Sequence, residues 1–82
     1  MKNTSTTLSL DQLPKGASAV VRNLRGGTEL KSRLAAMGLT EGARLLVLQN
    51  TGHGPMLVNV RDTRVALGRG EAIKVLVEKT GT

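Results

Sequence analysis

The stretch LAAMGLTEGARLLVL, residues 34–48, joins two segments of different hydrophobic period. In the segment before Gly38, apolar residues recur at i, i+4 and i+7, which is the spacing of one helical face. These residues are Leu30, Leu34 and Met37. Gly38 fits the position after a helix, where the backbone turns left-handed and only glycine does so cheaply. Gly42 is then followed by a continuous β-compatible run, ARLLVL. We therefore predict a helix of about ten residues with Thr28 as its N-cap, ending at Met37, and a strand after Gly42.

The flanking segments read as further strands. In ASAVVRNL (17–24) and in PMLVNVRD (55–62), successive residues would point to alternate faces of a strand. In the second segment this places Met56, Val58 and Val60 on one face. TRVALG (63–68) is a short strand after an Asp62–Thr63 turn, and EAIKVLVEK (71–79) places Ile73, Val75 and Val77 on one face. Both faces of RLLVL are apolar, so a sheet this small must curl to bury them.

The predicted fold is mainly β: a small five-stranded SH3-like barrel with one short helix inserted after the first strand. An OB-fold is the rival, but its helix usually lies between strands three and four. We expect residues 1–8 to be a disordered tail and residues 9–79 to form one domain.

The amino-acid composition argues against several classes of protein. The chain has 82 residues, no aromatic residue and no cysteine, so its small core has little room for a substrate cavity, and disulfides and thiolate sites are excluded. No apolar run has the length of a signal peptide or a membrane span, which predicts a soluble cytoplasmic protein with no direct membrane insertion. The formal net charge is +6, but the basic residues are scattered, as on a solubilising surface.

No motif predicts catalysis, a metal site or a cofactor. His53 is the one histidine, in a glycine-flanked loop where solvent exposure is the favoured interpretation; a metal site with Asp62 reaching across the hairpin is the alternative. The carboxylates are far apart in sequence, and RGGTEL (25–30) and LGRGEA (67–72) lack a nucleotide-binding pattern and read as turns. Nucleic acid is not expected as a partner, because no aromatic side chain is present for base stacking.

With catalysis, metal, cofactor and nucleic-acid binding disfavoured, the sequence favours a module that binds a partner protein. Four apolar residues have no obvious inward role: Leu39, Leu46, Met56 and Leu57. Exposed Met and Leu beside Gly-Pro loops suit protein docking. We predict a partner-binding surface around the helix end and the hairpin loop, formed by Met37, Gly38, Leu39, Gly54, Pro55 and Met56.

The same spacing resembles the FeoA family, the ferrous iron transport protein A. The first half matches as Leu30-x-x-x-Leu34-x-x-Met37-Gly38-Leu39-x-x-Gly42 followed by ARLLVL. The second half is GPMLVNVRDTRVALGRGEAIKVLV (54–77), which closes on Ala72, Val75 and Val77. The similarity covers about residues 8–78, and the order and distances of the elements make it specific.

The resemblance implies an SH3-like barrel and a cytoplasmic accessory role in bacterial ferrous iron uptake. The implied partner is the cytoplasmic part of the transporter's membrane subunit, which carries a G-protein-like domain. Two alternatives stay open: a stand-alone regulatory module of the iron-dependent repressor type, taking a proline-containing peptide, and a small basic nucleic-acid-binding barrel. Homo-oligomerisation also stays open.

Overall fold

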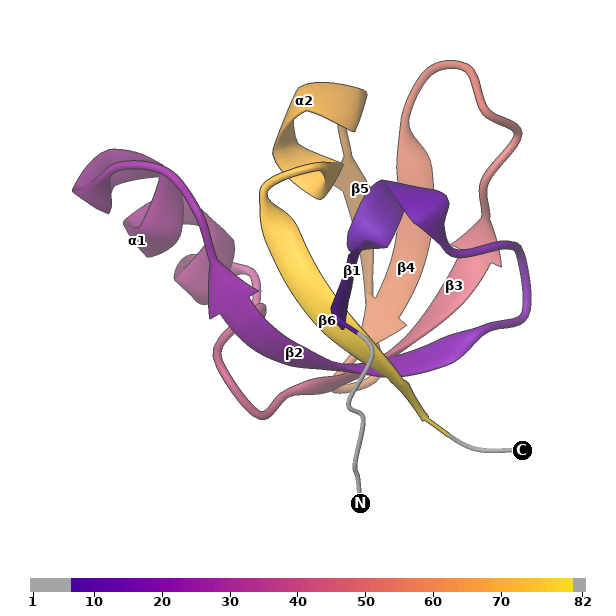
Figure 1. Cartoon of the computed structure of the whole chain (residues 1–82), viewed down its shortest axis with the longest axis horizontal. Coiled ribbons are helices and arrows are strands. Elements are labelled where there is room, and N and C mark those ends of the chain that lie inside the picture. The colour runs from indigo at the N-terminus through magenta and orange to yellow at the C-terminus, as the bar shows by residue number, and fades with distance from the viewer. Residues whose placement is uncertain (1–6, 81–82) are drawn as a thin grey trace.

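The computed structural model describes residues 7–80, which form one antiparallel sheet with three short helical segments (Figure 1). Its strands are β1 (Thr7–Ser9), β2 (Ser18–Leu24), β3 (Arg44–Gln49), β4 (Met56–Val60), β5 (Thr63–Leu67) and β6 (Val75–Thr80). The helical segments are η1 (Leu10–Gln12), α1 (Thr28–Ala36) and α2 (Arg69–Ala72). The strand order is β1-β6-β2-β3-β4-β5, and the sheet curves strongly around its core.

The predicted mainly β fold is confirmed, with one strand more than expected. The helix α1 follows β2, which is the first of the five predicted strands. The sixth strand is β1, where Leu8 pairs with Val77 of β6. The predicted disordered tail, residues 1–8, is therefore wrong for Thr7 and Leu8, while residues 1–6 lie outside the described part of the chain.

Helix α1 ends as predicted, and the way it ends also determines the position of Leu39. Gly38 has a φ of +96°, and its N–H donates to the Ala35 carbonyl at 2.9 Å. The Leu39 N–H donates to the Leu34 carbonyl at 3.0 Å. These two bonds form a Schellman motif, in which the residue after the glycine makes an apolar contact back to the helix. At the other end the N-cap is Gly27 rather than Thr28.

The core lies on one face of the sheet. Buried residues alternate along β2, β3 and β4, as the period-two pattern predicts. In β3, Leu45 and Val47 are buried, but Leu46 between them is 38% exposed. The prediction that both faces of RLLVL are buried is therefore wrong, since α1 stands beside the sheet and does not cover its outer face (Figure 1).

The last predicted strand begins later than expected. Residues 69–72 form the short helix α2, although LGRGEA was predicted to be a turn leading into a strand. The Gly68 N–H donates to Glu71 Oε1 at 3.1 Å, which satisfies one free donor at the start of this helix. Ile73, predicted to share a buried face with Val75 and Val77, is instead 52% exposed.

The turn between β4 and β5 also differs by one residue from the prediction. Val60 pairs with Thr63, so the two turn residues are Arg61 and Asp62, and Thr63 begins β5. Both turn residues have positive φ, 52° and 62°. This is the backbone of a type I′ turn, whose twist matches that of the strands it joins.

Candidate docking surface

The six residues predicted to bind a partner form two groups at opposite ends of β4. Gly38 packs beside the Arg61 side chain, at the end of β4, whereas Gly54 and Pro55 precede its first residue. The five residues of β4 separate the two groups, a span of about 17 Å. The helix end and the hairpin loop therefore lie at opposite ends of β4, and a partner-binding role that includes both stays a prediction.

Two of the six residues are inaccessible. Leu39 and Met56 are both 0% exposed. Leu39 turns inward because of the Schellman motif, and Met56 because it starts the inward-facing series of β4. Met37 and Gly38 are half-buried, while Gly54 and Pro55 are exposed. The prediction that Leu39 and Met56 are exposed is therefore wrong, and a docking role for the other four stays a prediction.

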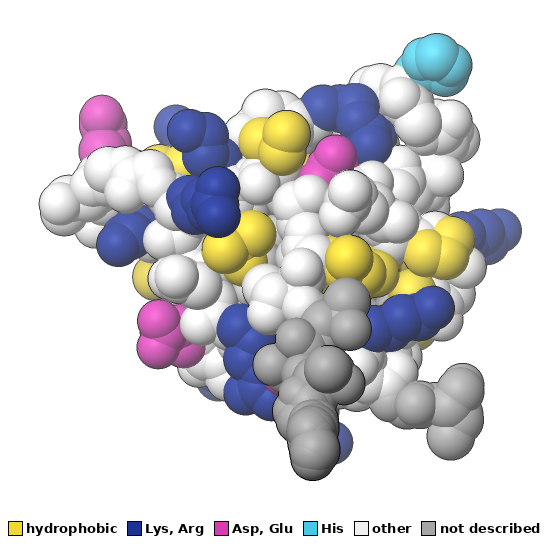
Figure 2. Space-filling view, in the orientation of Figure 1, with side chains coloured by type: hydrophobic (Ala, Val, Ile, Leu, Met, Phe, Trp, Pro, Cys, Tyr) yellow, Lys and Arg dark blue, Asp and Glu magenta, His cyan; other side chains and the backbone are white. Residues whose placement is uncertain are grey.

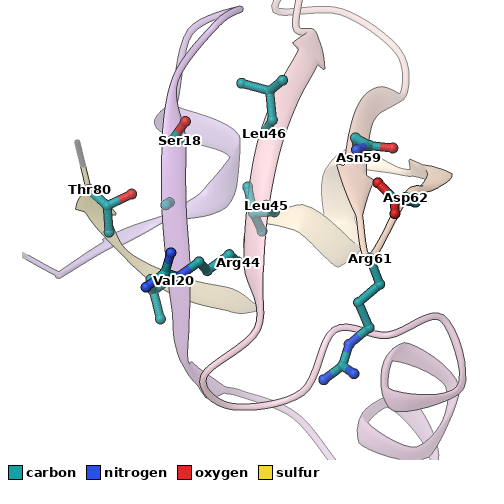
Figure 3. Close-up of a pocket in the computed structure, with 10 residues that line it drawn as sticks. Ser18, Val20, Arg44, Leu45, Leu46, Asn59, Arg61, Asp62 and Thr80 are labelled. Atoms are coloured by element: carbon teal, nitrogen blue, oxygen red, sulfur yellow. The ribbon is translucent and has the colours of Figure 1, made fainter. Parts of the chain in front are cut away.

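A different surface lies on the outer face of the sheet. There, an open hollow of about 630 Å³ spans β2, β3 and β4 (Figure 3). It is lined by consecutive residues of β2 and β3, by one residue of β4, by the β4–β5 turn and by the end of β6. The lining residues are Ser18, Ala19, Val20, Arg44, Leu45, Leu46, Asn59, Arg61, Asp62 and Thr80.

Strand register explains why the hollow forms around Leu46. Ser18 of β2 pairs with Leu46, and Leu46 pairs with Asn59 of β4. Ser18 also pairs with Thr80 of β6. Leu46 is thus the long apolar side chain in a row of short polar ones, and Figure 3 shows it between Ser18 and Asn59. Short neighbours leave its sides open to solvent, as its 38% exposure shows.

Positive charge borders this hollow. Arg44 extends toward Val20 on one side, and Arg61 extends toward the segment after α1, where its Nη2 donates to Thr40 Oγ1 at 3.4 Å (Figure 3). Arg64 lies just outside, opposite Asn59 in the β4–β5 ladder. Asp62 is the one carboxylate among the lining residues.

These charged groups are available to a partner. Between residues 7 and 80, the ion pairs are Arg22–Glu78 at 2.7 Å and Arg33–Glu71 at 2.6 Å, and neither includes a residue of the hollow. The outer face of the sheet therefore combines an exposed aliphatic centre with arginines that have no carboxylate partner within the described chain.

His53 lies far from this hollow. It is exposed in the β3–β4 loop, and Figure 2 shows the histidine at a corner of the molecule. Asp62, its suggested partner in a metal site, is at the opposite end of β4, so that pairing is wrong. No cluster of three His, Cys, Asp or Glu side chains occurs among residues 7–80.

A polar network that the sequence analysis missed holds the base of the β3–β4 loop. The Asn50 amide nitrogen donates to the Asp11 and Leu13 carbonyls at 3.0 and 2.7 Å. Arg69 donates to Asn50 Oδ1 at 3.0 Å and to the Asp11 carbonyl at 3.2 Å. The network joins η1, the loop and α2, three segments that are distant in sequence, so no local pattern could have indicated it.

Comparison with known proteins identifies the family. The FeoA domain family matches residues 8–79, which is nearly the whole of the described chain. The chain belongs to the FeoA family. The resemblance found in its sequence is thereby confirmed. A FeoA-family relative, the "Putative Fe(2+) transport protein A" of Methanocaldococcus jannaschii, is 33% identical over 64 residues, covering 78% of this chain and 77% of the relative.

Solved structures agree with the FeoA assignment. The crystal structure titled "Iron Uptake Regulatory Protein (FeoA)" superimposes with a TM-score of 0.88 and 35% identity, over 92% of this chain and 100% of that one. A manganese-dependent transcriptional repressor matches with a TM-score of 0.84 at 21% identity, over 95% of this chain and 44% of that one. The similarity to the repressor shows the fold alone.

None of the helices within residues 7–80 has the length and apolar character that a membrane span needs.

Proposed function

We propose that this protein is a cytoplasmic accessory of ferrous iron uptake that binds the GTPase-bearing membrane subunit of the transporter. The observation that carries the proposal is membership of the FeoA family, together with similarity to a protein named for Fe(2+) transport. In this proposal the chain regulates ferrous iron uptake by binding the membrane subunit and does not itself catalyse a reaction.

The surface supports a binding role. The hollow on the outer sheet face is open, the exposed aliphatic Leu46 lines it from its middle strand, and Arg44 and Arg61 lie at its border. An exposed apolar centre with a polar border is the usual anatomy of a protein interface. A catalytic pocket would instead enclose its substrate and bring polar groups together at one point.

The test compares ferrous iron uptake in cells that have and lack this protein. We expect deletion to change the rate of Fe²⁺ uptake, and the intact chain supplied in trans to restore it. The purified chain should bind the purified cytoplasmic domain of the membrane subunit. Unchanged uptake after deletion, together with no detectable binding between the two folded proteins, would refute the proposed function.

A further inference from the structure

We propose that the hollow around Leu46 is the docking site for an acidic segment of the partner protein. In this arrangement an aliphatic side chain of the partner packs on Leu46, and carboxylates of the partner pair with Arg44, Arg61 and Arg64. The inference rests on the proposed function and adds the face of this protein that docks and the chemistry that it recognises.

Leu46 is the better anchor of the two exposed large hydrophobic residues within residues 7–80. The other, Ile73, is 52% exposed but follows α2 and does not line the hollow. Leu46 instead lies on β3, the middle of the three strands that the hollow spans, and the half-buried Val20 lines the same hollow. Binding energy concentrates on apolar side chains that are central and become fully desolvated, so Leu46 has the position expected of such an anchor.

The charges select an acidic occupant. Arg44 and Arg61 line the hollow, Arg64 borders it, and Asp62 is the one opposing carboxylate, giving three positive charges against one negative. None of these arginines has a carboxylate partner among the described residues. A guanidinium can donate two parallel hydrogen bonds to a carboxylate, which gives both strength and orientation.

The same features favour a protein segment over nucleic acid or a lipid surface. Asp62 at the rim would repel phosphates, whereas a peptide can place its carboxylates away from that side. The centre of the hollow is aliphatic, and the chain has no aromatic side chain on which a base could stack. An extended acidic segment with one aliphatic residue can pack that residue on Leu46 and pair its carboxylates with the arginines.

Three variants of the full chain test the docking face by calorimetric titration with the purified cytoplasmic domain of the membrane subunit. We expect Leu46→Ser and Arg44→Glu each to weaken binding by about tenfold or more, the loss typical of a central interface residue. Asp62→Asn should strengthen binding severalfold, because it removes the repulsive charge. Wild-type affinity should fall between about 50 and 300 mM salt, and Arg44→Glu should reduce this dependence.

Matched controls use the same substitutions elsewhere on the surface. Ile73→Ser removes the other exposed large hydrophobic residue, and Lys31→Glu reverses a charge on the exposed side of α1. Both should bind like the wild type. Heteronuclear NMR spectra establish that each variant is folded before its affinity is interpreted.

The outcomes separate the inference from the proposed function. If the wild type binds the domain and the hollow variants bind equally well, the docking face is wrong and the proposed function stands. If the folded wild type does not bind, the docking inference fails, and the proposed function fails with it when deletion also leaves Fe²⁺ uptake unchanged. Tighter binding to phosphatidylglycerol vesicles or to duplex DNA than to the domain, lost in Arg44→Glu, would overturn the acidic protein segment as the occupant.

Discussion

Arg61 packs over Gly38, so the β4–β5 turn rests against the end of helix α1. A Cβ placed on Gly38 would stand 3.5 Å from Arg61 Cδ and 3.6 Å from Val60 Cγ1, which is ordinary contact distance. The contact connects the helix that stands beside the sheet to one end of the hollow, where Arg61 is part of the rim. The space at Gly38 would accept a methyl group, but its φ of +96° would not.

The first prediction concerns this backbone conformation. Gly38→Ala should lower the free energy of unfolding by about 1–2 kcal/mol, because an L-residue is strained in the left-handed region. The matched control is Gly70→Ala in α2, where φ is not positive and no atom lies within 4 Å of the added Cβ. That control should raise stability by about 0.4–1 kcal/mol. Urea unfolding of both variants measures the difference, and equal effects would contradict the assignment.

The second prediction separates a core leucine from a surface one. Leu39→Ala should destabilise the protein by about 2–5 kcal/mol, because Leu39 is wholly buried and its truncation leaves a cavity. Leu46→Ala should cost less than about 1 kcal/mol, since Leu46 is exposed. Thermal and urea unfolding provide the comparison. A Leu46→Ala variant as unstable as Leu39→Ala would show that the outer face is covered in the folded protein.

Leu39 and Leu46 also show which parts of the structure could be predicted from the sequence. The pattern around Gly38 predicted the helix end correctly, and a glycine at that position already implies that the next residue turns back toward the helix. The burial of Leu39 was therefore predictable from the motif. The exposure of Leu46 was not, because a β-compatible apolar run is the same whether a second layer covers the strand or not.

The end of the chain illustrates a second limit. Gly68 and Glu71 have the spacing of a helix start, with the glutamate reaching back to the first N–H, and the structure uses it. The prediction instead interpreted LGRGEA as a turn that leads into a strand. The hollow around Leu46 depends on the register between β2, β3 and β4, a long-range relationship that one sequence does not specify.

The third prediction concerns the network under the β3–β4 loop. Asn50→Ala removes two donated hydrogen bonds and the acceptor for both Arg69 and the Gly52 N–H, so it should cost about 1–3 kcal/mol. Amide hydrogen exchange in residues 51–54 should accelerate, because the base of the loop is released. Thr51→Ala is the control: its exposed hydroxyl bonds only within the loop, donating to the His53 carbonyl at 2.9 Å and accepting from the His53 N–H at 3.4 Å. In this variant only the exchange of His53 should change. Comparable exchange rates in the two variants would remove the proposed role of Asn50.

The fourth prediction concerns the type I′ turn. Asp62→Gly should stabilise the protein by about 0.5–1 kcal/mol, because glycine adopts the φ of +62° without strain. Asp62→Ala should instead destabilise it, since alanine has neither the freedom of glycine nor the local hydrogen bonding of aspartate. Urea midpoints of the two variants should lie on opposite sides of the wild type. A loss of stability in Asp62→Gly would mean that the carboxylate contributes more than the backbone strain costs.

The most direct test of the account is an NMR titration of the ¹⁵N-labelled chain with the cytoplasmic domain of the transporter's membrane subunit. The account predicts chemical-shift changes and line broadening that centre on the outer sheet face, at Ser18, Val20, Arg44, Leu46 and Asn59, with His53 and α2 unaffected. Shifts confined to the β3–β4 loop or to α2 would contradict the docking face. An unchanged spectrum at saturating partner would contradict the binding function itself.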